Sequence, residues 1–566
     1  MKRKEIAEKL EEIADLYEMK GVQFKPRAYR NAAQTIRALG EPVEDIVERG
    51  ELRDLPGIGE SMAEKVEEYL RTGEIGKFNE LKGDLPLDIG DLTAVEGLGP
   101  KKIIKLHREI GIKSLEDLKD AARSGKIESV EGFGERTQKK ILENIAFAEQ
   151  KGNRFLLGYV LPESGRLVDE MKDLCSRIEV AGSLRRRRET VGDVDIIAVE
   201  KKGEDLADRF TSMDEVSKVI SKGEKKTSVK LHGGIQVDLR IVEEDYFGAA
   251  LCYFTGSKQH NITLRTMARK RNLKLSEYGL FEGEERLAGR TEKEVYDQLD
   301  LDWIPPEMRE NQGEIELAEK GKLPTLVERG DVSGDLQMHS DWSDGKNTMR
   351  EMAEAARDIG HEYIAMTDHA GEIAIAHGLD LERVKKQGKE IEKLNDDLDG
   401  IRIIHGLEAN IKKDGKLDIS KDVIEEVDLV LGSIHSSLRA DRRDMTERMV
   451  TAVKSGQFRI LAHPTGRRLQ ERKGIDVDLE DVFEAASEAG TALEINAFPD
   501  RLDLNGYNVK RAIDAGVKLS IGTDSHRTDH LRFIDLGVST ARRGWAEKDD
   551  VINTLSWSGF SKFLER

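Results

Sequence analysis

The chain has 566 residues, 36% of them charged, with a formal net charge of −19 at pH 7. Because single hydrophobic cores rarely grow past about 250–300 residues, this length predicts several domains, and 38% hydrophobic content excludes global disorder. The two cysteines, Cys175 and Cys252, exclude a disulfide framework and favour a reducing cytoplasm. No apolar run approaches the roughly 20 residues that a membrane-spanning helix needs.

Three segments of the first 150 residues share an apolar-x-Gly-apolar-Gly pattern that opens an amphipathic helix: LPGIGESMAEKV, VEGLGPKKIIKL and VEGFGERTQKKI. Glycines permit a tight turn, and the N–H groups at the next helix start can bind a backbone phosphate without reading bases. One copy would be an ordinary capping turn, but three indicate helix-hairpin-helix DNA binding despite the acidic total charge. The glycines assigned to this contact are Gly57, Gly59, Gly97, Gly99, Gly132 and Gly134.

The segments FKPRAYRNAAQTIRAL at 24–39 and LPGIGESMAEKVEEYLRTG at 55–73 together resemble the small lyase domain of DNA polymerase beta. The resemblance implies that Lys65 attacks an abasic sugar as a Schiff-base nucleophile, for which its amine must be neutral. It also implies that Lys25 and Tyr29 support DNA binding. Two positions depart from the family: Phe24 stands where the family has a histidine, and Ser61 stands where it has a second lysine.

Acidic residues line a strand-like run within residues 180–200. Asp193 and Asp195 are one residue apart, so the two-residue period of a strand puts both carboxylates on one face. Asp238 follows in GIQVDLRIV, where apolar and polar residues alternate, and we expect it to face away from the core. Three carboxylates on neighbouring strands suit two Mg²⁺ ions, which activate a primer 3′-hydroxyl and stabilise the leaving pyrophosphate. The pattern predicts a nucleotidyltransferase, with Mn²⁺ as a substitute metal.

A phosphate-binding turn precedes these carboxylates. Gly182 and Ser183 can bring backbone N–H and hydroxyl groups to a phosphate, and Arg185–Arg188 add positive charge beside it. Together with YFTGSKQHNITLR at 253–265, this region resembles the family X DNA polymerases, a likeness that covers residues 1–315.

The family X resemblance implies a pocket for an incoming deoxynucleoside triphosphate. Tyr253 and Phe254 would wall the sugar, Asn261 would meet the minor-groove edge of the base, and Arg265 the template side. The full set that it implies for the pocket is Gly182, Ser183, Arg186, Tyr253, Phe254, Gly256, Asn261 and Arg265. Gln236 departs from DNA polymerase beta, which has an arginine near the third aspartate.

From Gly334 onward, strand and helix alternate about every 30 residues, the length of a βα unit. The seven apolar strand candidates are GDLQMHS, YIAMTDH, IRIIHGLEANI, LVLGSIHSS, RILAHPTG, ALEINAF and KLSIGTDSH. Nine of the twelve histidines follow Met338, mostly at strand ends, which form the active-site face of a β/α barrel. Mixed histidine and carboxylate ligands suit Zn²⁺, Mn²⁺ or Fe²⁺, which ionise water for attack on a phosphate ester. The candidate ligands are His339, Asp344, His369, Glu408, His435, His463, Asp524 and His526.

This C-terminal pattern resembles the PHP (polymerase and histidinol phosphatase) family over residues 334–566. The family is a distorted seven-stranded barrel, and the resemblance implies up to three Zn²⁺ or Mn²⁺ ions. Family members usually begin with His-x-His, whereas Gln337 stands first here. A glutamine oxygen ligates late transition metals less well than imidazole, so Gln337 is expected to be a weak ligand.

The predicted architecture is multidomain, α+β and α/β. Its parts are a small lyase-like helical domain (1–80), a helix-hairpin-helix subdomain (81–150), a nucleotidyltransferase palm (151–245), a nascent base-pair and dNTP subdomain (246–320), a linker (321–333) and a PHP phosphoesterase domain (334–566). Such a chain would be a cytoplasmic, nucleoid-associated monomer that acts on gapped or nicked double-stranded DNA with dNTPs.

Our main hypothesis is a repair polymerase that fills short gaps, such as those of base excision repair. The PHP domain would trim 3′ ends as a 3′–5′ exonuclease or 3′-phosphatase, or cleave at abasic sites, and Lys65 would add 5′-dRP lyase activity. In an alternative, Gln337 marks a catalytically weak PHP domain kept for structure or DNA positioning. A third interpretation, a small-molecule phosphatase fused to a DNA-binding module, leaves the aspartate triad without a role.

Overall fold

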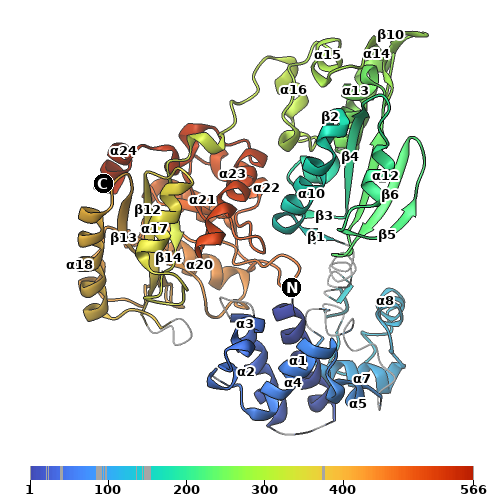
Figure 1. Ribbon diagram of the computed structural model, residues 1–566. Helices are drawn as coiled ribbons and strands as arrows, with labels where there is room; N and C mark the ends of the chain where they lie inside the picture. Colours follow the sequence, from blue (N-terminus) through green and yellow to red (C-terminus); the bar gives the residue numbers. More distant parts are fainter. Residues whose placement is uncertain are drawn as a thin grey trace. The chain divides into compact units, whose positions relative to one another are not determined.

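The computed structural model describes residues 2–564 except positions 21, 23, 39–42, 56, 84–91, 93–94, 96–97, 135–136, 140, 143–144, 146–153 and 372–376. The chain divides into two compact units, Met1–Asn153 and Arg154–Arg566. Figure 1 shows the first unit in blue as helices alone, and the second as sheets with helices. In the described part of the chain, no helix is long and apolar enough to cross a membrane.

The first unit is built from short amphipathic helices. They include α1 (Lys2–Met19), α2 (Lys25–Ala38), α3 (Val43–Glu48), α4 (Glu60–Thr72), α5 (Gly76–Gly83), α7 (Pro100–Ile110) and α8 (Leu115–Arg123). Helix α1 buries Ile6, Leu10 and Ile13 completely, and their i, i+4, i+7 spacing forms one apolar stripe along the helix. This stripe places α1 in the core of the unit.

The glycine turns of the first unit have the conformation that a helix hairpin requires. Gly57 and Gly132 have φ of 78° and 85°, in the left-handed region that glycine adopts without strain. Gly59 and Gly99 are the N-caps of α4 and α7, so N–H groups at those helix starts have no partner within the helix. Of the remaining turn glycines, the structure describes Gly134 but not Gly97. The predicted helix-hairpin-helix fold is confirmed.

The second unit begins with a five-stranded sheet of order β2-β4-β7-β6-β5, in which β4 and β7 are parallel and the other pairs antiparallel. Its strands are β2 (Cys175–Val180), β4 (Asp193–Glu200), β5 (Val216–Ser221), β6 (Lys226–Leu231) and β7 (Gln236–Ile241). Helices α10 (Leu157–Met171), α11 (Gly182–Arg185) and α12 (Leu206–Thr211) accompany the sheet, and β1 (Phe155–Leu156) pairs with β3 (Thr190–Val191). This sheet lies in residues 151–245, the segment for which the sequence predicts a nucleotidyltransferase palm, and it is called the palm below.

A small subdomain follows the palm. It comprises α13 (Phe247–Thr255), α14 (Lys258–Lys270), the antiparallel strands β8 (Leu273–Ser276), β9 (Gly279–Glu282) and β10 (Glu285–Ala288), then α15 (Glu292–Asp297) and α16 (Glu314–Glu319). Buried Glu292 accepts hydrogen bonds from Arg185 of the palm at 2.8 Å and from Arg309 at 2.7 Å. This buried pairing fixes the start of α15 against the palm.

The C-terminal part of the second unit is a seven-stranded parallel sheet in chain order, from β11 to β17. The strands are β11 (Gly334–Met338), β12 (Tyr363–Ala370), β13 (Arg402–Asn410), β14 (Leu429–Ser433), β15 (Ile460–Leu461), β16 (Ala492–Asn496) and β17 (Leu519–Gly522). A parallel bridge between Met338 and Ser525 brings the end of the last strand back to the first. All seven strand candidates of the sequence are present, and the predicted distorted β/α barrel is confirmed.

Helices cover the outside of this barrel. They include α17 (Met349–Asp358), α18 (Leu381–Asp397), α20 (Arg442–Lys454), α21 (Leu479–Ala489), α22 (Gly506–Asp514) and α23 (Ile534–Arg543). Residues 321–333, expected to be a linker, lie against the barrel: the Val327 N–H donates to the Ala546 carbonyl at 2.9 Å, and Leu326 bridges to Glu547.

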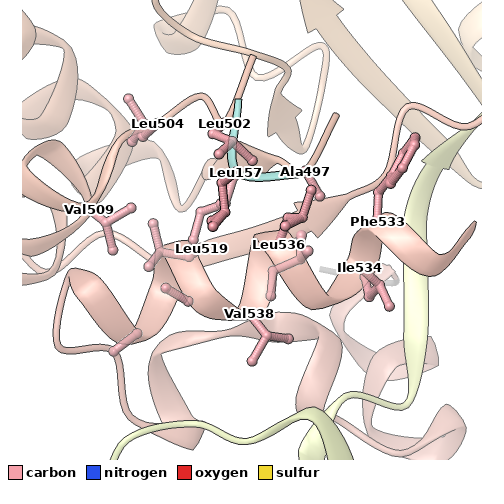
Figure 2. Close-up of a cluster of buried hydrophobic side chains, with 14 of the residues drawn as sticks. Leu157, Ala497, Leu502, Leu504, Val509, Leu519, Phe533, Ile534, Leu536 and Val538 are labelled. Carbon is pink, nitrogen blue, oxygen red and sulfur yellow. The ribbon is translucent and has the colours of Figure 1, made fainter. Parts of the chain in front are cut away.

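The palm and the barrel share one hydrophobic core. Leu157, at the start of α10, is completely buried in a cluster made mostly of barrel residues. Figure 2 shows its side chain among those of Leu502, Leu519 and Leu536. The next residue, Gly158, lies so close to the barrel that an added Cβ would be 2.8 Å from Pro499 and 2.9 Å from Leu536. The two domains therefore pack without space for a side chain at this point.

We predict that Leu157→Ala lowers the free energy of unfolding by about 2–5 kcal/mol, because it leaves a cavity between palm and barrel. Tyr159→Ala is the matched control on the same helix turn, since Tyr159 is 62% exposed, and should change stability by less than about 0.5 kcal/mol. Urea-induced unfolding measures both variants. Equal effects of the two substitutions would show that Leu157 does not join the domains.

Candidate active sites

The parallel pairing of β4 with β7 brings the predicted carboxylates together. In the register of the two strands, Asp195 lies directly opposite Asp238, and Asp193 lies opposite Gln236. Burial, followed by the charge of Asp193, raises the pKa of Asp195 to about 6, with a smaller contribution from Asp238. A carboxyl whose pKa is raised by burial and by a neighbouring like charge is a candidate functional group.

Two cations and an amide contact these carboxylates. The Lys226 ammonium lies 2.6 Å from Asp238, whose other oxygen accepts a hydrogen bond from the Gln236 amide at 2.9 Å. The Arg240 guanidinium lies 3.5 Å from Asp195 and over the ring of Phe254. Burial raises the pKa of Asp238, but Lys226 and its hydrogen-bond partners outweigh this and lower it.

We expected Asp238 to face away from the core. Its side chain does lie with the polar groups of β4 and β6, yet the residue is only 5% exposed, since partners from both neighbouring strands enclose it. Lys226 and Arg240 were not singled out in the sequence. Arg240 follows Asp238 by two positions, so the strand period alone placed it on the carboxylate face. Lys226 comes from another strand, and only the sheet register reveals it.

The turn before β4, which the sequence assigns to phosphate binding, approaches the carboxylates. Gly182 has φ of 64°, and a Cβ there would lie 3.1 Å from the Asp195 carboxylate. Gly182 and Ser183 are the first two residues of the short helix α11. A larger residue at position 182 would therefore crowd the Asp195 carboxylate.

The segment with the expected nucleotide contacts lies beside this turn. The Asn261 amide donates to the Tyr253 carbonyl at 2.7 Å, and the rings of Tyr253 and Phe254 meet edge to face at 5.1 Å. The Arg186 guanidinium donates to the Thr255 carbonyl. Gly256 and Arg265 are also among the expected nucleotide contacts. A Cβ on Gly256 would lie 3.1 Å from the Arg186 guanidinium. The Arg265 guanidinium donates to the Asn261 carbonyl at 3.3 Å. The structure thus brings the predicted pocket residues of α11, α13 and α14 together.

The barrel gathers its predicted ligands around Glu408, a buried residue of β13. His435 and His463 lie 2.9 and 3.1 Å from one Glu408 oxygen, while His339 and His369 lie 3.5 and 3.6 Å from the other. Burial raises the pKa of Glu408, but the neighbouring histidines outweigh this and hold it well below its usual value. A carboxylate between four imidazoles offers the mixed oxygen and nitrogen donors that could hold a transition metal ion.

A second group lies at the ends of β11, β12 and β17. Asp344 is 3.7 Å from His369 and 3.4 Å from His526, and Asp524 is 3.2 Å from His339. Among the described residues, the ligand sets whose donor atoms all lie within 4.8 Å of one another are both in the barrel: His339, Asp344, His369 and His526, and His369, Glu408 and His435. The palm carboxylates do not form so tight a group.

The barrel residues fit metal ions by a further criterion. Buried ring nitrogens normally have hydrogen-bond partners. Both nitrogens of His339, Nδ1 of His369 and Nδ1 of His463 are buried without one in the described structure. Nitrogens of this kind, beside carboxylates, suit Zn²⁺ or Mn²⁺.

Gln337 occupies the first position of the expected His-x-His pair. It is completely buried, its amide donates to Glu408 at 3.0 Å, and its oxygen faces the Asn496 amide at 3.4 Å. Nearby Asp524 lies 3.3 Å from the Arg501 guanidinium. Sequence reasoning missed Asn496 and Arg501, although Asn496 ends a predicted strand, as most of the candidate ligands do.

Lys65 of the first unit projects from α4 and donates to the backbone and hydroxyl oxygens of Ser61 at 2.7 and 2.8 Å. Burial lowers its pKa, and the charges of Lys77 and Lys25 add to this against opposing glutamates. Lys25 lies over the Tyr17 ring. The ring of Tyr29 packs on Tyr17 and is 5% exposed, which favours a core role over a direct DNA contact.

Comparisons with known proteins find family matches in four stretches of the chain. A helix-hairpin-helix domain matches residues 1–75, a SAM-like helix-hairpin-helix tandem 89–146, the DNA polymerase beta thumb 250–310, and the PHP domain 335–498. A probable phosphatase of Shewanella sp. (strain ANA-3) is 30% identical over 37% of this chain and 81% of its own.

Two relatives are polymerases. DNA polymerase lambda of Rattus norvegicus is 25% identical over 54% of this chain and 56% of its own. The protein named DNA polymerase/3′-5′ exonuclease PolX of Bacillus subtilis (strain 168) is 38% identical over the full length of both chains. Full-length identity at this level, with matches to the thumb, hairpin and PHP families, shows the family. The chain belongs to the family X DNA polymerases that carry a C-terminal PHP domain.

Proposed function

We propose that this polymerase fills short gaps in double-stranded DNA during repair, with Asp193, Asp195 and Asp238 as ligands of Mg²⁺. The observation that carries the proposal is the register that sets Asp195 opposite Asp238 beside the Gly182 turn. Bound Mg²⁺ would supply positive charge to the triphosphate and lower the pKa of the primer hydroxyl. The chain's own groups would position the substrate: the Gly182 turn and Arg186 at the phosphates, and Tyr253 and Phe254 at the deoxyribose.

We expect Asp195→Asn to reduce single-nucleotide insertion on a gapped duplex by on the order of 10³-fold, because a neutral amide neither holds the cation nor balances its charge. Asp169→Asn, which changes an exposed carboxylate on palm helix α10, is the matched control and should retain wild-type rates. Insertion is followed with Mg²⁺ and with Mn²⁺. If the wild-type chain extends no primer, or Asp195→Asn extends it normally, the assignment is wrong.

For the barrel we propose metal-dependent trimming of DNA 3′ ends, as a 3′–5′ exonuclease or 3′-phosphatase, with cleavage at abasic sites as a related reaction. The proposal is supported by the Glu408 cluster and by the buried ring nitrogens without partners. A bound Zn²⁺ or Mn²⁺ would provide ionised water for attack on phosphorus. The ligands would be Gln337, His339, Asp344, His369, Glu408, His435, His463, Asp524 and His526.

We expect His435→Ala to lose on the order of 10²-fold or more of the Mn²⁺-dependent 3′ trimming, together with part of the bound metal, because it removes a ligand beside Glu408. His377→Ala, an exposed histidine outside both ligand sets, is the control. Trimming of a 3′-labelled strand and metal content by mass spectrometry are measured on the same samples. Unchanged trimming and metal content in His435→Ala would refute the assigned centre.

The hydrogen bonds of Gln337 favour a second candidate function. Its amide donates to Glu408, so the position acts as a hydrogen-bond donor where the family usually has a metal ligand. A barrel of this kind could be retained to support the palm or to position DNA. Metal analysis of the purified chain discriminates between the two functions: bound ions support catalysis, and a metal-free, trimming-inactive barrel supports positioning.

A 5′-dRP lyase activity is the third element of the proposal, supported by the lowered pKa of Lys65. The neutral amine would add to the C1′ aldehyde of an abasic sugar, with loss of water, to form an imine. Borohydride reduction should trap this imine as a covalent adduct in wild type and in Lys113→Ala, an exposed lysine of the same unit, but not in Lys65→Ala. An adduct of equal yield in Lys65→Ala would refute the assignment of Lys65 as the lyase nucleophile.

A further inference from the structure

The arginine-rich loop after α11 has an acidic partner outside the palm. The Arg186 guanidinium lies 3.1 Å from the carboxylate of Glu310, which follows α15 in the chain, and the Arg188 guanidinium lies 3.7 Å from the same oxygen. The side chains of Arg186 and Glu310 are each 13% exposed. A carboxylate this enclosed is costly to leave without a partner.

Glu310 also has a partner from the barrel. Arg543, the last residue of α23, lies 3.2 Å from the Glu310 oxygen that Arg186 contacts. The same Arg543 nitrogen donates to the main-chain carbonyl of Arg186 at 2.6 Å. Arg543 is 10% exposed, so its two contacts are nearly closed to solvent. A barrel residue thus holds both the backbone of Arg186 and the carboxylate that binds its side chain.

This arrangement matters because Arg186 has two possible anionic partners. To bind a triphosphate, its guanidinium must leave Glu310 or share its donors with that carboxylate. With Arg543 in place, Glu310 keeps a close cation when Arg186 turns toward phosphate. Without Arg543, the cation left beside Glu310 is Arg188, whose guanidinium is 3.7 Å from the carboxylate and 47% exposed. Glu310 would then compete more strongly with the triphosphate for the Arg186 guanidinium.

We propose that Arg543 of the barrel is a positioning residue of the nucleotide pocket in the palm, which neutralises Glu310 and so leaves Arg186 available to the triphosphate. The inference rests on the proposed role of Arg186 in nucleotide binding. It gives the PHP domain a part in nucleotide affinity that is independent of its metal centre.

The test is single-nucleotide insertion by the full chain on gapped DNA at varied dNTP concentration. Arg543→Ala should raise the KM for dNTP about tenfold and leave kcat nearly unchanged, the signature of lost ground-state binding. Arg543→Lys keeps a cation for Glu310 and should be intermediate. In the Arg543→Ala background, Glu310→Gln removes the competing charge and should return KM most of the way to wild type, which lost packing alone would not do.

Arg542→Ala is the matched control. Arg542 is the neighbouring arginine of α23 and pairs with Glu307 at 2.8 Å, in the same subdomain as Glu310. It should leave the KM for dNTP unchanged while disturbing the same contact between domains. The unfolding midpoint of each variant checks that the fold persists.

Arg186→Ala separates failure of this inference from failure of the proposed function. If Arg186→Ala raises KM but Arg543→Ala does not, or if Arg542→Ala raises it equally, Arg543 has no positioning role and the polymerase site stands. If Arg186→Ala leaves KM unchanged, Arg186 does not bind the triphosphate, and this inference fails together with the proposed role of Arg186, while Asp195→Asn tests the aspartate site separately. If Glu310→Gln does not restore Arg543→Ala, competition by the carboxylate is excluded.

Discussion

Parallel strand pairing is the constraint on which both centres depend. In the palm, the single parallel pair of the sheet sets Asp195 opposite Asp238. In the barrel, the same kind of pairing sets His369 opposite Glu408, and the neighbouring parallel strands deliver the other ligands to one rim. A shift of one residue in either register would turn one member of each pair to the opposite face. The candidate sites of the palm and of the barrel therefore both depend on the register of parallel strands.

Much of this was predictable because it depends on local periodicity. Asp193 and Asp195 share a face in any strand, and a histidine at the end of a barrel strand reaches the active rim in any β/α barrel. The seven strand candidates were also found from local sequence, since each is a short, mainly apolar segment that ends near polar residues. Gly182 and Gly57 were identified because few other residues tolerate their backbone conformation.

What the sequence did not predict depends on contacts between distant segments. Lys226 reaches Asp238 only because β6 is the antiparallel neighbour of β7, and no spacing along the chain records that. Gln337 was expected as a weak metal ligand, but its hydrogen bond to Glu408 is visible only in the folded barrel. Arg543 is the extreme case, since 233 positions separate it from Glu310. The residues around a reactive group were less predictable than the group itself.

The absence of a side chain at Gly158 has a consequence for how the two domains evolve together. The palm surface there is shaped to fit Pro499 and Leu536, and it carries the apolar side chain of Leu157. Gene fission between the two halves would expose that surface to water and favour aggregation of the free polymerase. Selection on the palm alone would then preserve a folded barrel, even in a lineage whose metal centre had lost its ligands one by one.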